Sequence, residues 1–302
     1  MSLTATTMEA APSPPAMDAL PADTPEFEIR ARRGWVAIDF KELIHYRELL
    51  YFLTWRDVKV RYKQTVLGFA WAVLQPVMNM LVMTIIFGYV ADFKDKIPAE
   101  LIARQIPYSL YNYAGILPWM LFAVGVGSGG TSLLNQQNLL TKVYFPRLFV
   151  PASVIGAAMV DTLISLIVFF VMMAGYRVAP SWTVIFLPFL LMLTAVAATA
   201  IAFSLSSLTV TYRDFRFLIP FMVSTWQLIS PVGYPLEPHR IWIRWILRMN
   251  PMYGIINAFR SVLLGQHWDF PGLAIAIVET AGLLIFGLYY FKKTERRFAD
   301  IA

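Results

Sequence analysis

The sequence predicts an all-α polytopic membrane protein. Of its 302 residues, 58% are hydrophobic and only 15% are charged, whereas an ordinary soluble domain has about 25% charged residues. The mean hydropathy is +0.59. Apolar residues gather in long runs that few charges interrupt, and most Lys and Arg residues lie on one side of those runs. Together these observations favour several helices that cross a bilayer.

Six apolar segments are long enough to cross the bilayer, since about 30 Å of hydrocarbon takes roughly 20 helical residues. They lie at residues 65–91, 109–132, 150–174, 183–209, 217–235 and 271–291. Pro76, Pro118 and Pro188 lie inside them, and membrane helices tolerate proline when neighbouring groups satisfy the freed backbone atoms. We therefore predict six transmembrane helices per subunit, in a domain over residues 65–302.

The N-terminal tail does not resemble a secretory signal. Residues 1–29 contain no Lys or Arg and no long apolar run, and they are rich in Pro, Ala and acidic residues. A signal peptide needs both a basic start and an apolar stretch. We expect residues 1–35 to form a disordered cytoplasmic tail.

A polar helix is predicted between the tail and the first span. Apolar residues recur at helical spacing from residue 39 to about residue 55, with charged residues between them. They are Leu43, Tyr46, Leu50 and Leu53. This pattern predicts an amphipathic helix within residues 36–64, too polar to span, that lies on the cytoplasmic membrane surface. A helix packed on a partner protein is the alternative.

The segment between the fifth and sixth spans is long and apolar. Residues 233–269 contain two short helical patterns separated by Asn250 and Pro251. Neither pattern is long enough to cross the bilayer alone. We predict short re-entrant or interfacial helices on the outer side; a soluble extracytoplasmic hairpin is the alternative.

The distribution of cations predicts the orientation. Seventeen Lys and Arg residues fall on the side of the termini, and eight fall on the other side. The eight are Lys94, Lys96, Arg104, Arg177, Arg240, Arg244, Arg248 and Arg260. Because cytoplasmic loops carry an excess of cations, both termini are expected in the cytoplasm. The net charge of +6 therefore reflects membrane topology, and we expect no nucleic-acid partner.

Several kinds of chemistry are excluded by the residues present. There is no Cys, and the three His residues are far apart in the sequence, so no metal site is expected. No Gly-x-x-x-x-Gly-Lys-Ser/Thr motif occurs, which argues against an ATPase in this chain. We expect no catalytic residues.

Two acidic residues, Asp161 and Glu279, fall within predicted spans. A carboxylate at membrane depth is costly and needs an explanation. A proton-coupled transporter would use such a residue in its transport path. The other explanation is structural: each acid is neutral or hydrogen-bonded at a helix interface, or lies near the membrane interface.

Four stretches carry a resemblance to a known family. They are residues 56–76, residues 138–147, residues 212–216, and residues 230–235 leading to 250–260. In these stretches the chain resembles ABC-2 type permeases of polysaccharide exporters, the group that exports O-antigen, capsule and teichoic acid. The resemblance covers about residues 40–295 and leaves out the first 35.

The resemblance implies a homodimer around a polysaccharide channel in the bacterial inner membrane, driven by two copies of a separate ATP-binding subunit. ATP and Mg would be bound by that partner, and this chain would hold no cofactor. A short coupling helix would contact the ATPase, and the helix at residues 39–55 would be a gate helix at the cytoplasmic entrance. The coupling residues would be Leu139, Lys142, Tyr144, Phe145, Pro146 and Arg147.

A lipid-linked glycan is the expected substrate. Its pyrophosphate end would be captured by the cations just before the first span, which are Arg56, Lys59, Arg61 and Lys63. Sugar rings would then slide over residues that line the channel. The candidates are Phe69, Trp71, Gln75, Asn79, Tyr89, Trp119, Trp226 and Tyr234. An ordinary interfacial belt of aromatic residues would account for most of the same positions.

Two other functions fit parts of the sequence. A drug or antibiotic exporter of the wider ABC-2 class shares the Asn250-Pro251 segment but is not expected to carry the pattern from Arg56 to Arg61. A proton-coupled secondary transporter would use an acid such as Asp161 and show inverted internal repeats.

Overall fold

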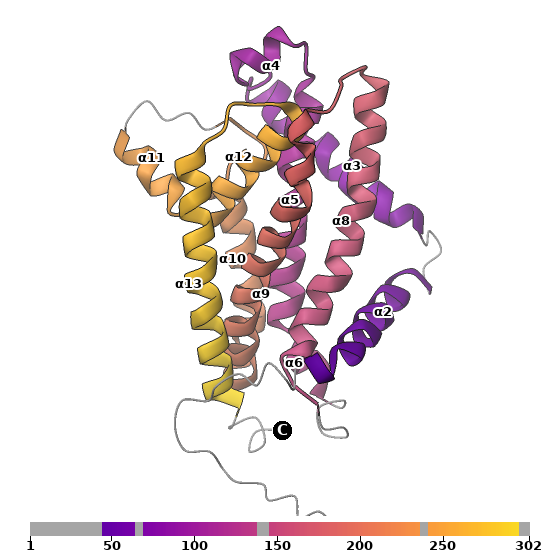
Figure 1. Cartoon of the computed structure of the whole chain (residues 1–302), viewed down its shortest axis with the longest axis vertical. Helices are drawn as coiled ribbons and strands as arrows, with labels where there is room; N and C mark the ends of the chain where they lie inside the picture. The colour runs from indigo at the N-terminus through magenta and orange to yellow at the C-terminus, as the bar shows by residue number, and fades with distance from the viewer. Residues whose placement is uncertain (1–43, 64–68, 138–144, 236–240, 296–302) are drawn as a thin grey trace, which may run out of the picture. The chain divides into compact units, whose positions relative to one another are not determined.

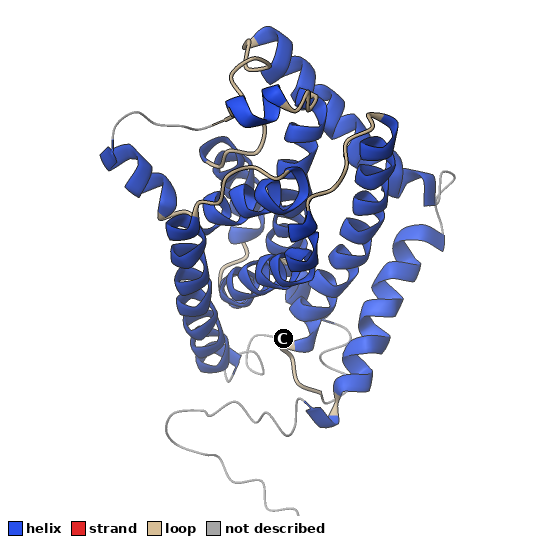
Figure 2. Ribbon diagram, turned by 45° about the horizontal axis from the view of Figure 1, so that its top comes forward, coloured by secondary structure: helices blue, strands red, loops and turns tan. Residues whose placement is uncertain are grey.

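The computed structural model describes residues 44–63, 69–137, 145–235 and 241–295, and every regular element within these ranges is helical (Figures 1 and 2). The elements are α2 (Arg47–Lys63), α3 (Phe69–Met83), η1 (Thr84–Val90), α4 (Ala99–Ala103), α5 (Tyr108–Gly130), α6 (Ser132–Asn135), α8 (Phe149–Gly175), η2 (Trp182–Phe186), α9 (Leu187–Thr211), α10 (Phe215–Ile229), α11 (Ile241–Arg248), α12 (Pro251–Leu264) and α13 (Phe270–Glu295). The predicted amphipathic helix extends to Lys63 as α2, and the tail at residues 1–35 lies outside the described ranges.

Five helices are long and apolar enough to span a membrane, and a sixth apolar helix is shorter. The five are Ala70–Val90, Tyr108–Gly130, Phe149–Gly175, Trp182–Thr211 and Phe270–Glu295. They match five of the six predicted spans. The predicted fifth span is α10, whose 15 residues extend about 22 Å. The chain is a polytopic membrane protein.

Helix α5 is the centre of the bundle, in contact with α3, α8, α9, α10 and α12. Close packing against α9 depends on small residues. A Cβ at Gly125 would lie 2.8 Å from the Ala198 methyl, and one at Gly129 would lie 2.9 Å from the Ala202 methyl. Small residues at this spacing let two membrane helices approach closely, where van der Waals contact holds them together.

We name the two ends of the helix bundle after a short helix that lies at each. The α6 end contains α6, the start of α8 and the ends of α9 and α13, and the α4 end contains α4, the start of α5 and α11 (Figure 1). Helix α12 packs against α5, α9 and α13.

Helix α10 stops inside the bundle because Pro231 follows Ser230. The residue before a proline is disfavoured in helical conformation, and Ser230 is extended, with φ −90° and ψ 140°. The carbonyls of the following turn are bound by side chains from other helices. Arg260 donates from Nη2 to the Val232 oxygen over 2.9 Å, and the Tyr108 hydroxyl donates to the Gly233 oxygen. The apolar composition of residues 217–235 predicts a full span, but the proline ends it early.

Asn250 joins the end of α10 to the start of α12. Its Oδ1 accepts hydrogen bonds from the Met252 N–H over 3.1 Å, as an N-cap, and from the Trp226 indole over 2.9 Å. Its Nδ2 donates to Ser230 Oγ over 2.9 Å. The two short helices predicted around Asn250 and Pro251 are therefore confirmed as α11 and α12.

Arg260 is completely buried in α12. Its guanidinium lies 3.9 Å from the centre of the Tyr111 ring, and Nε donates to the Tyr111 backbone oxygen over 3.3 Å. The charge count that predicts the orientation includes Arg260 as a loop cation. Its burial removes it from that count and leaves seven cations on that side.

Contact between α12 and α13 requires a glycine at position 254, because a Cβ there would overlap the Gly272 carbonyl oxygen. Gly254→Ala is expected to lower the free energy of unfolding by about 2 kcal/mol. Gly282→Ala in α13 is the matched control, since a Cβ there meets nothing within 4 Å and alanine favours helix by about 1 kcal/mol. Thermal unfolding of the purified variants measures both. Equal midpoints for Gly254→Ala and wild type would contradict this packing.

Candidate functional site

Helix α2 packs along α8 through a close approach of two small residues. A Cβ at Gly156 would lie 2.9 Å from the Thr54 methyl and 3.5 Å from Thr54 Cβ. Leu53 of α2 is buried in a cluster with residues of four other segments. The cluster contains Leu53, Leu133, Phe145, Leu148, Phe149, Val150, Phe203 and Phe291, and we call it the α6-end cluster.

An ion pair in the α2–α8 interface joins Arg61 of α2 to Asp161 of α8. The Tyr62 hydroxyl donates a hydrogen bond to the same carboxylate. Burial, together with this hydrogen bond, raises the pKa of the Tyr62 phenol well above its usual range, so Tyr62 remains a donor at physiological pH. Of the two explanations predicted for Asp161, the structure supports an acid bonded at a helix interface.

A second set of polar contacts lies one to two turns earlier on α2. Asp57 accepts from Arg56 Nη2 over 2.8 Å and from Ser153 Oγ of α8 over 3.0 Å. Arg56 Nη2 also donates to Gln136 Oε1, just after α6, over 2.9 Å. Helix α2 is thus attached to α8 at two levels by polar bonds, which exchange partners more readily than tightly packed apolar side chains.

The four predicted entrance cations divide into two kinds. Arg56 and Arg61 are half-buried and engaged with other side chains of the chain. Lys59 and Lys63 are exposed, and the Lys59 ammonium lies 5.5 Å from the centre of the Trp55 ring.

A cavity of about 330 Å³ opens between α2, α3, α5 and α8. Arg61, Tyr62 and Asp161 form its charged part, and Trp71, Gln75 and Pro76 of α3 form another wall. The remaining lining residues are Ala72, Met120, Val124, Ser128, Ala158, Thr162 and Ser165. The volume lies in the range of ordinary small-ligand sites. The structure therefore brings one predicted entrance cation together with two of the predicted lining residues.

The other predicted lining residues lie elsewhere. Trp119 is buried in the core beside Phe122, and Tyr234 packs against Phe87 with ring centres 5.4 Å apart. Trp226 binds Asn250 as described above. Asn79 is partly buried in α3 and lines none of the cavities described here, whereas Tyr89 is largely exposed at the end of η1. The side chain of Phe69 lies outside the described part of the structure.

Three of the predicted coupling residues are described, and they face inward. Phe145 and Pro146 are buried, Phe145 in the α6-end cluster. Arg147 donates from Nη1 to the Glu295 carbonyl oxygen of α13 over 3.1 Å. These residues precede α8 as loop and turn, not as part of a helix. Leu139, Lys142 and Tyr144 lie outside the described residues.

Glu279 is the second of the two acids that fall within predicted spans. It lies partly buried in α13, and within the described ranges its Oε2 has no hydrogen-bond partner. No group of three or more His, Asp or Glu residues that could hold a metal ion occurs in the part of the chain that the structure describes.

Sequence reasoning missed Asp57, Gln136 and Ser153, which anchor α2. Asp57 is visible in the sequence as a lone acid among cations, and an acid in that position is a signal for pairing within the helix. Gln136 and Ser153 give no such signal, since they reach α2 only through the tertiary fold.

Replacing Asp161 with Asn is expected to loosen α2. The pair is about one third exposed, so its loss costs about 1 kcal/mol and speeds hydrogen exchange of the α2 amides roughly fivefold. Hydrogen exchange followed by mass spectrometry measures this over residues 47–63. Asp214→Asn is the control, because Asp214 is exposed and makes no side-chain capping bond. Unchanged exchange of α2 in Asp161→Asn would contradict the role of the pair.

Comparison with known proteins identifies relatives over most of the chain. The ABC-2 type transporter family matches residues 48–264. The O-antigen export system permease protein RfbA of Myxococcus xanthus is 30% identical over 268 residues, which cover 86% of this chain and 97% of that protein. An RfbA protein of Klebsiella pneumoniae is 26% identical, and the match covers 84% of this chain and 95% of that protein. The polysialic acid transport protein KpsM of Escherichia coli is 23% identical, and the match covers 80% of this chain and 91% of that protein.

The family match spans well over half of the chain and includes α2, the cavity and α12. In ABC-2 transporters the permease pairs with ABC ATPase subunits, and ATP binding belongs to that separate subunit. The relatives are bacterial export permeases. This multi-pass chain therefore belongs to the ABC-2 type transporter family, as a transport subunit related to O-antigen and polysialic acid export permeases.

Proposed function

We propose that this chain forms the channel of an ATP-driven exporter that moves a lipid-linked, O-antigen-like polysaccharide from the cytoplasm across the bacterial inner membrane. The observation that carries the proposal is the cavity between α2, α3, α5 and α8, where Arg61 meets Trp71 and Gln75. A cation beside an aromatic and an amide side chain suits a substrate with a phosphate end and a sugar chain.

The relatives support a large glycan over a small drug. The RfbA proteins are named for O-antigen export and KpsM for polysialic acid transport, and this chain covers at least 91% of each. Both names refer to a glycan, and they name two different ones. A loosely specific aromatic and polar path fits that range better than a closed pocket.

Helix α2 has the properties of a gate. Its polar bonds to α8 leave Arg61 with a partner that a phosphate can replace, because pyrophosphate offers the same kind of acceptor oxygens as Asp161. In this proposal the exposed Lys59 and Lys63 attract the pyrophosphate end, and Arg61 then exchanges Asp161 for it. That exchange would release the end of α2 from α8 and widen the cavity.

Coupling to ATP would pass through the α6-end cluster. Phe145, on the loop before α8, and Phe149, the first residue of α8, share this cluster with Leu53 of α2. Because packed side chains transmit displacement, a push by the ATPase on the segment around residues 139–147 would reach both α8 and α2.

A homodimer with two ATPase subunits completes the proposed exporter. Helix α3 supports this assembly, because only 17% of the most apolar stretch of its span is buried within the chain, against 78% for α5. Such a helix must face lipid, the substrate path or a second copy. Both termini would lie in the cytoplasm.

The ion pair of Asp161 argues against the proton-coupled alternative. Arg61 and Tyr62 both bind the Asp161 carboxylate at the α2–α8 interface, whereas a proton carrier needs a carboxyl group that is free to exchange its proton along the transport path.

Reversing the two exposed cations tests the proposed capture step. Lys59→Glu combined with Lys63→Glu is expected to lower export at least about tenfold, since each cation near an anionic group contributes about 1 kcal/mol. Surface polysaccharide is measured in cells that lack their own permease and express this chain with its ATPase. Arg47→Glu is the control, because Arg47 is exposed at the other end of α2. Normal export by the double variant at normal membrane levels would overturn the capture role.

A further inference from the structure

Two consecutive residues of α2, which lies along α8 (Figure 1), connect parts of the chain that are apart in the sequence. Arg56 Nη2 donates to Gln136 Oε1, just after α6, over 2.9 Å, and Asp57 accepts from Ser153 Oγ of α8 over 3.0 Å. Arg56 and Asp57 also bind each other, at 2.8 and 3.1 Å. Helix α2 is therefore bonded on both sides of the segment that connects α6 to α8. We call Arg56, Asp57, Gln136 and Ser153 the polar clamp.

The contact between Arg56 and Asp57 is not one that a helix favours by itself. Consecutive side chains leave a helix about 100° apart and do not face each other. Each of these two side chains has a second partner outside α2, Gln136 or Ser153. The partners on both sides account for the contact, so the clamp depends on the positions of α6 and α8.

The bond between Arg56 and Gln136 is sensitive to small displacements. It is 2.9 Å long, and a hydrogen bond is lost beyond about 3.5 Å, so a shift of about 1 Å breaks it. The Arg56 side chain is 33% exposed, which lets water replace the lost acceptor at low cost. Leu53 and Leu133 meet in the apolar α6-end cluster, where attraction has no directional requirement and survives the same shift.

Gln136 lies next to the place where the ATPase would act. The segment proposed to receive the push, around residues 139–147, begins three residues later in the sequence. Helix α6 is a single turn, Ser132–Asn135, which packs against α5, α8 and α9. A displacement of that segment would therefore reach Gln136 along the chain, before it reached any other part of the clamp.

We propose that Gln136 is a positioning residue that makes the release of α2 depend on two inputs. The ATPase displaces Gln136 from Arg56, and the substrate displaces Asp161 from Arg61. Each step removes one polar bond, so nucleotide alone or substrate alone leaves α2 attached to α8 by the other. This role rests on the proposed function, since it takes the ATPase to act on residues 139–147.

Hydrogen exchange of α2 in the complex of the full chain with its ATPase tests this role, because the measurement needs nucleotide but no glycan. Exchange over residues 47–63 is followed by mass spectrometry with and without Mg and a non-hydrolysable ATP analogue. In wild type the analogue should speed α2 exchange about fivefold. Gln136→Met keeps the length of the side chain but removes the acceptor. It should exchange at that faster rate without nucleotide and gain less than about twofold when the analogue is added.

Three variants separate this role from a merely structural one. Gln136→Glu keeps an acceptor oxygen for Arg56 and should restore both the slow resting exchange and the response to nucleotide. Asp161→Asn loosens α2 at a different bond, so the analogue should still add its full effect. Asn135→Leu is the matched change from an amide to an apolar side chain. Asn135 bonds to Thr131 within its own turn, and the variant should behave as wild type.

A full nucleotide response in Gln136→Met, or a lost response in Asn135→Leu, would overturn the role of Gln136 and leave the proposed exporter intact. A purely structural bond would give that full response, because nucleotide would then act elsewhere and its effect would add. An α2 that does not respond to nucleotide in the wild-type complex would also overturn this role alone. An ATPase that does not co-purify with the wild-type chain would overturn the proposed function, and this role with it.

Discussion

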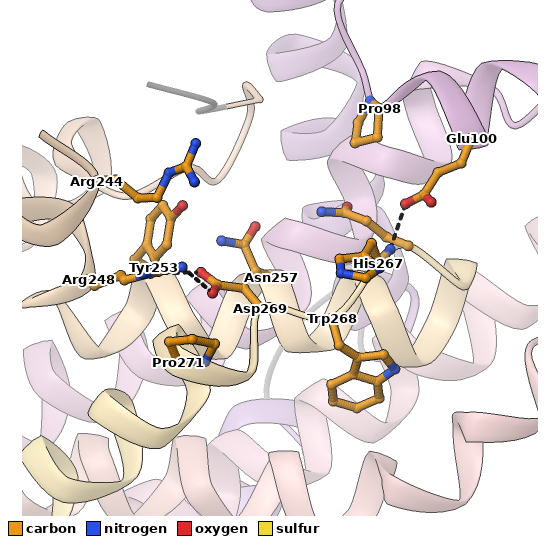
Figure 3. A pocket seen from close by; sticks show the side chains of 11 residues that line it. Pro98, Glu100, Arg244, Arg248, Tyr253, Asn257, His267, Trp268, Asp269 and Pro271 are labelled. Carbon is orange, nitrogen blue, oxygen red and sulfur yellow. Dashed lines mark hydrogen bonds and ion pairs between the residues drawn. The ribbon is translucent and has the colours of Figure 1, made fainter. Parts of the chain in front are cut away.

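The polar backbone at the end of α10 must be satisfied inside an apolar bundle, and much of the structure follows from this constraint. The residues from Ser230 to Gly233 are buried, and an unpaired carbonyl in apolar surroundings costs several kcal/mol. Arg260 and Tyr108 bind the carbonyls of Val232 and Gly233, and Asn250 binds Ser230. Because Arg260 lies on α12, this short helix must be buried beside α5. Helix α11 is thereby held at the α4 end, where Arg244 and Arg248 line a cavity of about 490 Å³ (Figure 3).

The opposite end of the bundle follows a different physical principle. There, α2 is attached by an ion pair, by hydrogen bonds and by one close contact at Gly156. The ion pair is partly open to water, so its net contribution is small. The α10–α12 junction is buried and hydrogen-bonded by side chains of several helices, whereas the ion pair of α2 is partly open to water, so the two ends differ in how readily a small free energy can rearrange their polar bonds. An exporter that admits its substrate from one side needs this asymmetry.

The long apolar runs of the sequence were sufficient to predict five spans and the short helices around Asn250. Those features depend on composition over many residues, which averages out local detail. The early end of α10 depends on Pro231 alone, and the burial of Arg260 depends on carbonyls some 30 to 150 residues away in the sequence. Trp71 and Gln75 were found in the cavity because they share a helix face near the cations. Trp119 is instead buried in α5 beside Phe122, and Trp226 binds Asn250, which only the tertiary fold brings near.

Release of α2 from α8 during transport is the central claim, and a reversible bridge between the two helices tests it most directly. The chain contains no Cys, and a Cβ at Gly156 would lie 3.5 Å from Thr54 Cβ, within the disulfide range of about 3.5–4.5 Å. Thr54→Cys with Gly156→Cys is reconstituted with the ATPase in vesicles, and ATP-dependent polysaccharide transport is measured before oxidation, after oxidation and after reduction. We predict that oxidation stops transport, that reduction restores it, and that neither single-Cys variant responds. Transport by the oxidised, disulfide-bridged protein at the same rate as by the protein whose disulfide has been reduced would contradict the account.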